Sequence, residues 1–290
     1  MKINFLTVHW GSDDWIEMQT GQIAKTTVSP YEIYAFANFE SPLNKKFTHC
    51  FQHPIKEHWV KLNLLAQIAC LRAVNDKEWL VFLDSDAFPI KQWEDSVQSM
   101  LERNDLVAVQ RKENLGDEQP HPCFCVTTVG FWKRIKGDWT PGFRWKNDLG
   151  DRVTDVGGNL LGQLGREDVQ WHRIMRSASC GDHPLFFGVY GEIVYHHGAG
   201  SRSAFSRLDH YLLEHHYSRL YMWLLRATRQ RKKRVDIAAR ENGRLAATMK
   251  ERLERDLRMF LEGCHSVEMG EPADGPNRED PRVGSRAQDA

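Results

Sequence analysis

The sequence predicts an α/β protein, a mixed and mainly parallel β-sheet flanked by helices, with a C-terminal helical extension. Short apolar runs alternate with helically spaced apolar residues as far as about residue 205, and the pattern beyond that point is helical. The chain has 290 residues, of which 41% are hydrophobic, enough for one large domain and an extension. We expect the domain at 1–205, the extension at 206–265 and a disordered tail at 266–290.

The first strands and helix of the domain lead toward one sheet edge. Residues 1–8 and 31–36 have the apolar and aromatic character of buried strands, and residues 79–83 form a third such run. An amphipathic helix is expected between the second and third strands, because four apolar residues recur there at helical spacing: Val60, Leu64, Ile68 and Leu71.

Helices and strands continue to alternate after Pro89, and helices take over near the C-terminus. The expected elements are a helix at 93–101, a strand at 106–109, a polar loop at 111–120, an extended segment at 123–131, a helix from Leu208, a basic block at 229–234 and a charged helix at about 244–261.

Charge and hydropathy narrow the class of protein. Lys and Arg together number 39, as do Asp and Glu, so nothing in the overall charge indicates nucleic acid as a partner. The N-terminus reads as a strand rather than a signal peptide, and no apolar run approaches the roughly 20 residues of a membrane span. We therefore expect a cytoplasmic protein.

The cysteines are widely scattered, and without a secretion signal we expect them to be reduced thiols: Cys50, Cys70, Cys123, Cys125, Cys180 and Cys264. A zinc site at 121–125 is disfavoured, because the segment lacks C-x-x-C spacing and a second ligand pair.

Two carboxylates follow the strand at 79–83. Asp84 and Asp86 are one residue apart, so an extended backbone places both side chains on one face and Ser85 on the other. Paired carboxylates at the carboxyl end of a strand suit Mg²⁺ or Mn²⁺, and open α/β sheets bind their ligands at that edge. Turn formation and helix capping are the alternative explanation for these residues.

This region resembles the nucleotide-sugar glycosyltransferases of the GT-A fold, which has a Rossmann-like sheet. Residues 58–65 and 78–87 are similar to the H-x-x-W-x-K and E-W-x-W-W-x-D-S-D-A patterns of plant xyloglucan xylosyltransferases and of yeast galactosyl- and mannosyltransferases. The resemblance covers about thirty residues. It implies a D-x-D metal site at Asp84 and Asp86, with Asp84 and Ser85 also toward the nucleotide and Lys61 close to it.

A second segment, 193–202, resembles the late H-x-x-G element of retaining GT-A enzymes. Alternation along a strand lets only one of His196 and His197 face the metal, and the spacing to Gly200 favours His197. A packed or surface histidine pair is the alternative reading. The residues that the resemblance places near the diphosphate are Gly198, Gly200 and Arg202.

Two acidic residues are candidates for the catalytic group. Asp155 opens a D-V-G-G sequence that is similar to the mid-domain acidic motif of several GT-A families, which contacts the donor sugar or the acceptor. Asp168 lies in a segment that loosely resembles the E-D-x-x-x-x-R helix start of inverting enzymes, where the aspartate is the general base. An acid-rich helix N-terminus explains Asp168 equally well.

The resemblance to GT-A enzymes implies a metal-dependent glycosyltransferase, and the segments that carry it slightly favour retention. It would use Mn²⁺ or Mg²⁺ and move a sugar from a nucleoside diphosphate, UDP favoured, to a glycan or other hydroxyl acceptor. The loop after the first strand would border the base and ribose through His9, Trp10 and Asp14.

Two alternatives remain at this stage. One is a binding module of the same fold without turnover; the other is a nucleotidyltransferase, disfavoured because the loop at 9–15 has no basic residue. The aromatic and basic C-terminal helix suggests peripheral association with the inner membrane face, or simply a helix packed on the domain.

Overall fold

The computed structural model describes residues 1–198, 223–225 and 227–267. The predicted sites Gly200 and Arg202, the start of the helix expected from Leu208, and nearly all of the expected tail lie outside the described residues. Within the described part of the chain, no helix has the length and apolar character needed to cross a bilayer.

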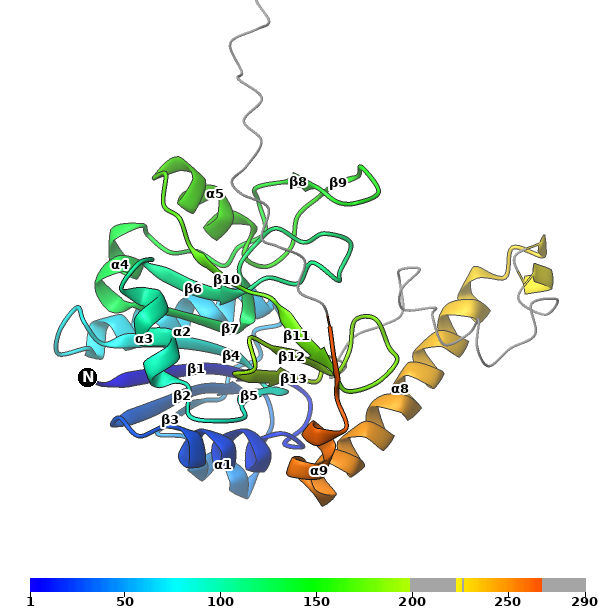
Figure 1. Cartoon of the computed structure of the whole chain (residues 1–290), viewed down its shortest axis with the longest axis horizontal. Coiled ribbons are helices and arrows are strands. Elements are labelled where there is room, and N and C mark those ends of the chain that lie inside the picture. The colour runs from blue at the N-terminus through cyan, green and yellow to red at the C-terminus, as the bar shows by residue number, and fades with distance from the viewer. Residues whose placement is uncertain (199–222, 226, 268–290) are drawn as a thin grey trace, which may run out of the picture.

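Within the described residues a seven-stranded sheet forms the centre of the domain (Figure 1). Four of its six strand pairs are parallel, which confirms the mixed, mainly parallel sheet. In spatial order its strands are β10 (His172–Ile174), β6 (Leu106–Val109), β7 (His121–Thr128), β4 (Trp79–Asp84), β1 (Ile3–His9), β2 (Tyr31–Ala37) and β3 (His49–Phe51).

Helices cover both faces of this sheet, as expected. The helix α1 (Ile16–Thr26) and α3 (Glu94–Leu101) pack on one face, while α2 (His58–Arg72), α4 (Val129–Arg134) and α5 (Gly158–Arg166) pack on the other. A short 3-10 helix, η1 (Pro42–Lys46), links β2 to β3.

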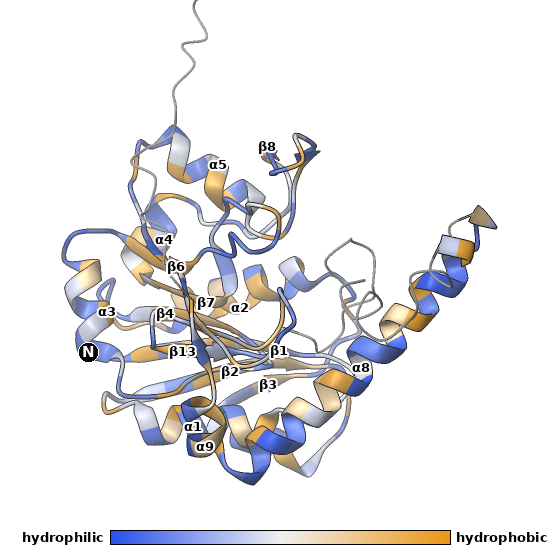
Figure 2. Cartoon of the chain, turned by 45° about the vertical axis from the view of Figure 1, so that its right-hand side comes forward, coloured by the Kyte–Doolittle hydropathy of each residue, from blue (hydrophilic) through white to orange (hydrophobic). Residues whose placement is uncertain are grey.

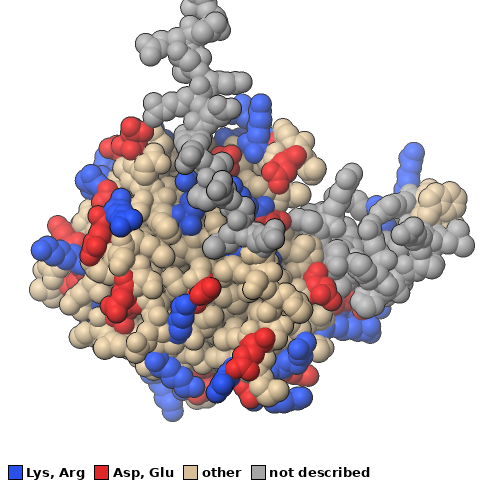
Figure 3. All heavy atoms as spheres, in the orientation of Figure 1, with Lys and Arg blue, Asp and Glu red and all other residues tan. Residues whose placement is uncertain are grey.

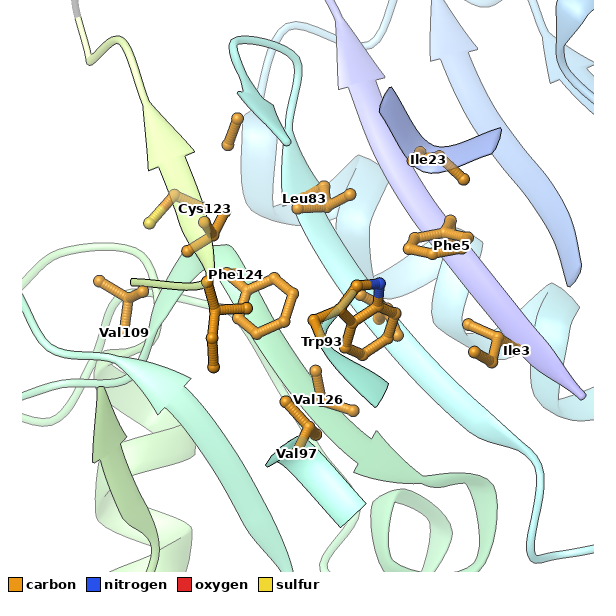
Figure 4. Close-up of a cluster of buried hydrophobic side chains, with 14 of the residues drawn as sticks. Ile3, Phe5, Ile23, Leu83, Trp93, Val97, Val109, Cys123, Phe124 and Val126 are labelled. Carbon is orange, nitrogen blue, oxygen red and sulfur yellow. The ribbon is translucent and has the colours of Figure 1, made fainter. Parts of the chain in front are cut away.

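Strand β4 shows why its sequence is continuously apolar. Trp79, Val81 and Leu83 join the cluster on the α1 side, while Leu80 and Phe82 join the cluster on the α2 side. A strand buried on both faces has no polar face to alternate with. Figure 4 shows the first cluster, in which the fully buried Trp93 lies among side chains from several elements.

A second sheet, which the sequence did not predict, joins the central sheet where β4 ends. Its strand order within the described residues is β14 (His265–Ser266), β11 (Arg176–Ser179), β12 (Gly188–Tyr190), β13 (Val194–His196) and β5 (Ala87–Pro89), all antiparallel. Because β5 follows Asp86 directly, this sheet brings distant segments to the carboxylates. A separate hairpin pairs β8 (Trp145–Lys146) with β9 (Arg152–Val153).

The C-terminal extension contains α8 (Arg231–Arg255) and α9 (Leu257–Glu262), so the helix expected at about 244–261 is in fact two helices. Asp256 is extended (φ −158°) and its carboxylate accepts a hydrogen bond from the Met259 N–H, which ends one helix and caps the next. Along α8, hydrophilic and hydrophobic residues alternate (Figure 2).

Three further expectations need correction. The extended segment expected at 123–131 ends at Thr128, whose hydroxyl caps α4 by accepting the Phe131 N–H. Residues 167–173 do not begin a helix, because α5 ends at Arg166 and β10 follows. Cys180 and Cys264 form a disulfide rather than two free thiols.

On the face drawn in Figure 3, acidic and basic side chains are interspersed over an otherwise uncharged surface. This distribution matches the equal totals of 39 basic and 39 acidic residues.

Candidate metal centre

Two carboxylates and an imidazole meet at the carboxyl end of β4. Asp84, Asp86 and His196 each offer a ligand atom, and these atoms all lie within 4.8 Å of one another. His196 Nε2 is 3.4 Å from Asp86 Oδ1 and 3.7 Å from Asp84 Oδ2. Two carboxylate oxygens and one imidazole nitrogen form a donor set that fits Mn²⁺ or Mg²⁺.

Strand pairing explains how His196 reaches this site from 110 positions away in the sequence. In the ladder between β13 and β5, His196 pairs with Ala87, the residue that follows Asp86. The register of the second sheet therefore completes the ligand set.

The prediction that His197 meets the metal is corrected by the structure. The His197 ring points to the opposite side, where Nδ1 lies 2.9 Å from the Tyr195 hydroxyl and Nε2 lies 3.1 Å from the Ala246 carbonyl on α8. Burial lowers the pKa of His197 to about 4. The spacing to Gly200 was misleading, because alternation along β13 is what decides which ring faces the carboxylates.

Asp84 is surrounded by imidazoles from three separate elements. His58, in the first turn of α2, places Nε2 3.3 Å from Asp84 Oδ1. His121, at the start of β7, places Nδ1 3.9 Å from Asp84 Oδ2 and accepts the Cys123 N–H at that nitrogen. His196 completes the group. No sequence pattern predicted a role for His58 or His121 at this site, although His58 lies within the motif that carries the family resemblance.

These neighbours keep both carboxylates ionised. Burial alone raises the pKa of Asp84, but the hydrogen bond and charge of His58, together with the charges of His121 and His196, outweigh it and hold that pKa well below its usual range. For Asp86, burial likewise raises the pKa, and the charge and hydrogen bond of His196 lower it more. Two charged carboxylates at neutral pH are what a divalent cation requires.

The backbone after β13 holds Asp86 in place. The Gly198 N–H donates to Asp86 Oδ2 at 3.0 Å, and the His197 N–H donates to the Asp86 carbonyl at 3.0 Å. Gly198 has φ +74°, a conformation that favours glycine. The Gly198 amide is thus bonded to a metal-ligand candidate, a different role from the diphosphate contact that was expected.

The last residue of β1 and the loop that follows it provide one buried and two exposed site candidates. His9 is 2% exposed and lies 3.1 Å from Gln19 Oε1, and burial lowers its pKa to about 4. Gln19 in turn donates to the backbone carbonyls of Asp84 and Ala87. Through Gln19, His9 therefore stabilises the backbone at residues 84–87, which we call the metal loop, and it does not line a surface that a nucleotide could contact. Trp10 and Asp14 are exposed.

Lys61 lies close to Trp10, as a shared nucleotide-binding role would require. Its Nζ is 3.8 Å from the centroid of the Trp10 ring, and burial lowers its pKa to about 8. Lys61 is one turn after His58 on α2, so both residues lie on the side of the helix that faces the site. Ser85 is half-buried in the turn between the two aspartates.

The two acidic candidates lie at opposite edges of the sheet. Asp155 precedes the N-terminus of α5, where Gly157 approaches the Pro120 carbonyl just before His121, so it is on the same edge as the carboxylates. Asp168 precedes β10, which runs parallel to β6. β6 and β4 are both antiparallel to β7, so β10 runs in the same direction as β4. Asp168, which precedes β10, therefore lies at the amino end of the strands, away from the metal centre at their carboxyl end.

Comparison with known proteins gives little further information. No protein-family model and no curated protein matches the chain. Among solved structures, a crystal structure of S. aureus TarS has a TM-score of 0.37 and 12% identity over 48% of this chain and 30% of that one.

Two structures of TarS 1–349 give the same TM-score of 0.37 and identity of 12%. The one in complex with UDP covers 48% of this chain and 50% of its own, and the other covers 54% and 58%. This chain thus spans less than two thirds of the length of each TarS chain, and a likeness this weak carries no argument about function.

Proposed function

We propose that the chain is a metal-dependent glycosyltransferase that moves a sugar from a nucleoside diphosphate sugar to a hydroxyl acceptor. The observation that carries the proposal is the group of Asp84, Asp86 and His196 at the carboxyl end of β4. This is the edge at which open α/β sheets bind nucleotides, and two of the three residues, Asp84 and Asp86, lie in the segment that resembles the D-x-D motif of GT-A enzymes.

The three ligands would hold Mn²⁺ or Mg²⁺. A bound divalent ion stabilises the negative charge that develops on the leaving diphosphate as the glycosidic bond breaks. His58 and His121 touch the Asp84 carboxylate from two further sides and limit its orientation.

Other residues of the chain would bind the rest of the donor. Lys61 and the N-terminal end of α2 offer positive charge to the diphosphate. Trp10, Asp14 and Ser85 would contact the base and ribose, with UDP favoured as the nucleotide. Asp155 is the acidic candidate on the correct edge to meet the sugar or the acceptor.

Retention of configuration is the better supported outcome. The argument for inversion depended on Asp168 as general base, and Asp168 lies at the other edge of the sheet. A glycan is the acceptor class we propose. Peripheral membrane association through the basic start of α8, where Lys232 and Lys233 are exposed, belongs to the same proposal.

The test is release of nucleoside diphosphate from UDP-, GDP- and dTDP-sugars, with Mn²⁺, Mg²⁺ or EDTA. We expect slow hydrolysis of one donor that requires metal and falls at least 100-fold in Asp86→Ala. Asp168→Asn is the matched control and should keep wild-type activity.

Metal-independent turnover that survives Asp86→Ala would disprove the site assignment. Donor binding without turnover, even when candidate acceptors are supplied, would favour a binding module of the same fold. Pyrophosphate as the released product would instead indicate a nucleotidyltransferase.

A further inference from the structure

The C-terminal helices pack against the sheet that supplies His196. Met249 and Leu253 of α8 and Phe260 of α9 are buried in a cluster with Phe88 of β5 and Tyr195 of β13. The Phe260 and Tyr195 rings meet edge to face, with centroids 5.6 Å apart. Figure 1 shows α8 and α9 beside the second sheet, near the N-terminal end of α1. The extension therefore packs against the two strands, β5 and β13, that flank the metal centre.

His197 links this extension to the metal loop. Its ring lies between the Tyr195 hydroxyl and the Ala246 carbonyl of α8, and packs against Trp15 with ring centroids 4.7 Å apart. The same Trp15 ring also contacts α8, because Lys250 Nζ lies 5.4 Å from its centroid. A movement of α8 would therefore disturb His197. The residues before and after it in the sequence, His196 and Gly198, both contact Asp86.

Backbone hydrogen bonds continue from His197 in two directions. Toward the metal centre, the His197 and Gly198 amides donate to Asp86. Away from it, the His197 carbonyl accepts the Phe187 N–H at 3.0 Å, and the Phe187 carbonyl accepts the Cys180 N–H at 2.8 Å. Asp86 and Cys180 are thus joined by an unbroken ladder across adjacent segments.

A disulfide links the C-terminal extension to the second sheet. Cys180 follows β11, and its partner Cys264 lies between α9 and β14, which pairs with β11 through Ala178 and Ser179. The bond spans 84 positions of sequence. β14 has only two residues, so the disulfide is the covalent attachment that fixes a short strand and the two helices before it.

We propose that the C-terminal extension is a redox-sensitive clamp on the metal centre. With the disulfide formed, α8, α9 and β14 hold β13 so that His196 and the Gly198 amide stay on Asp86. A dithiol reductant transfers two electrons and two protons to the Cys180–Cys264 bond, giving two thiols and oxidised dithiol. β14 and the helices then separate from β11 more readily, and the metal centre loosens. This inference rests on the proposed function, because it concerns regulation of the same site.

The test compares the oxidised protein with protein treated with dithiothreitol, using two readouts. The first is Mn²⁺ affinity by calorimetric titration, which we expect to weaken at least tenfold on reduction. The second is hydrogen exchange of the peptide containing Val194–His196, which we expect to become faster. Each sample is accompanied by a thiol count, which should rise by two on reduction.

Two variants sharpen the comparison. Cys180→Ser with Cys264→Ser should behave like the reduced wild type and no longer respond to dithiothreitol. Cys70→Ser, which removes a free thiol of α2, should respond as the wild type does. If the double variant fails to fold, reduction of the wild-type protein still decides the question.

A rise of two thiols with unchanged Mn²⁺ affinity and unchanged exchange would overturn the proposal. The exchange readout needs no donor, acceptor or metal. Failure of the glycosyltransferase assignment is therefore distinguishable from failure of the clamp.

Discussion

His58 shows how one side chain can tune a metal ligand without binding the metal itself. Its Nε2 lies 3.3 Å from Asp84 Oδ1, while Asp84 Oδ2 faces His196. One oxygen of the carboxylate is thus occupied, and the other is directed toward the candidate cation position. Groups that orient a ligand in this way typically change metal affinity 10- to 100-fold when they are removed.

We therefore expect His58→Ala to weaken Mn²⁺ binding by about tenfold, because Asp84 loses the contact that fixes its orientation. His58→Gln retains a donor and should recover part of the affinity. Calorimetric titration of Mn²⁺ measures both. Equal affinity in the wild type and in His58→Ala would show that the contact does not organise the site.

Among the elements, α2 and β13 each serve two purposes. The apolar face of α2 packs on the central sheet, while its first turn places His58 and Lys61 at the site. β13 is buried along its whole length, and its alternation directs His196 to the carboxylates and His197 to α8. In both cases the packing that forms the fold also orients the functional side chains.

The docking of α9 can be tested by comparing adjacent residues. Phe260 is buried against Tyr195, whereas Met259 is 70% exposed. We expect Phe260→Ala to lower the free energy of unfolding by about 3–5 kcal/mol, since it removes a large buried ring. Met259→Ala should change it by less than about 0.5 kcal/mol. Denaturant titration measures both, and similar losses would contradict the packing described for α9.

At the scale of the whole molecule, local signals were sufficient for the inner strands of the central sheet but not for its edge strands β3 and β10 or for the second sheet. The apolar runs and helical spacing predicted β1, β2, β4, β6 and α2 because each pattern lies within one short segment. β5 and β13 have only three residues each and gain their stability by pairing across more than a hundred positions. No local pattern contains that pairing.

The candidate site divides in the same way. Asp84 and Asp86 could be predicted because strand and carboxylates are contiguous in the sequence. The choice between His196 and His197 depends on the register of β13 with β5, and the Cys180–Cys264 bond depends on where the extension packs. Asp168 was predicted as a general base at the start of a helix, and that helix does not form.

The stability of the whole chain should depend on pH through His9. In the folded protein burial lowers the pKa of His9 to about 4, whereas the unfolded chain has the ordinary value of 6.5. Between these values the unfolded state binds more protons, so the free energy of unfolding falls as the pH decreases from 6.5 toward 4. From pH 7 to pH 5 this one group should cost about 2 kcal/mol.

The variant His9→Gln isolates this contribution, because a glutamine amide can also donate to Gln19 Oε1 but does not titrate. We expect the wild type to lose about 2 kcal/mol more than the variant between pH 7 and pH 5, measured by denaturant titration at each pH. Since Gln19 also supports the backbone at Asp84 and Ala87, protonating His9 would weaken the metal loop as the fold loosens. Parallel pH profiles for the two proteins would contradict a buried, neutral His9.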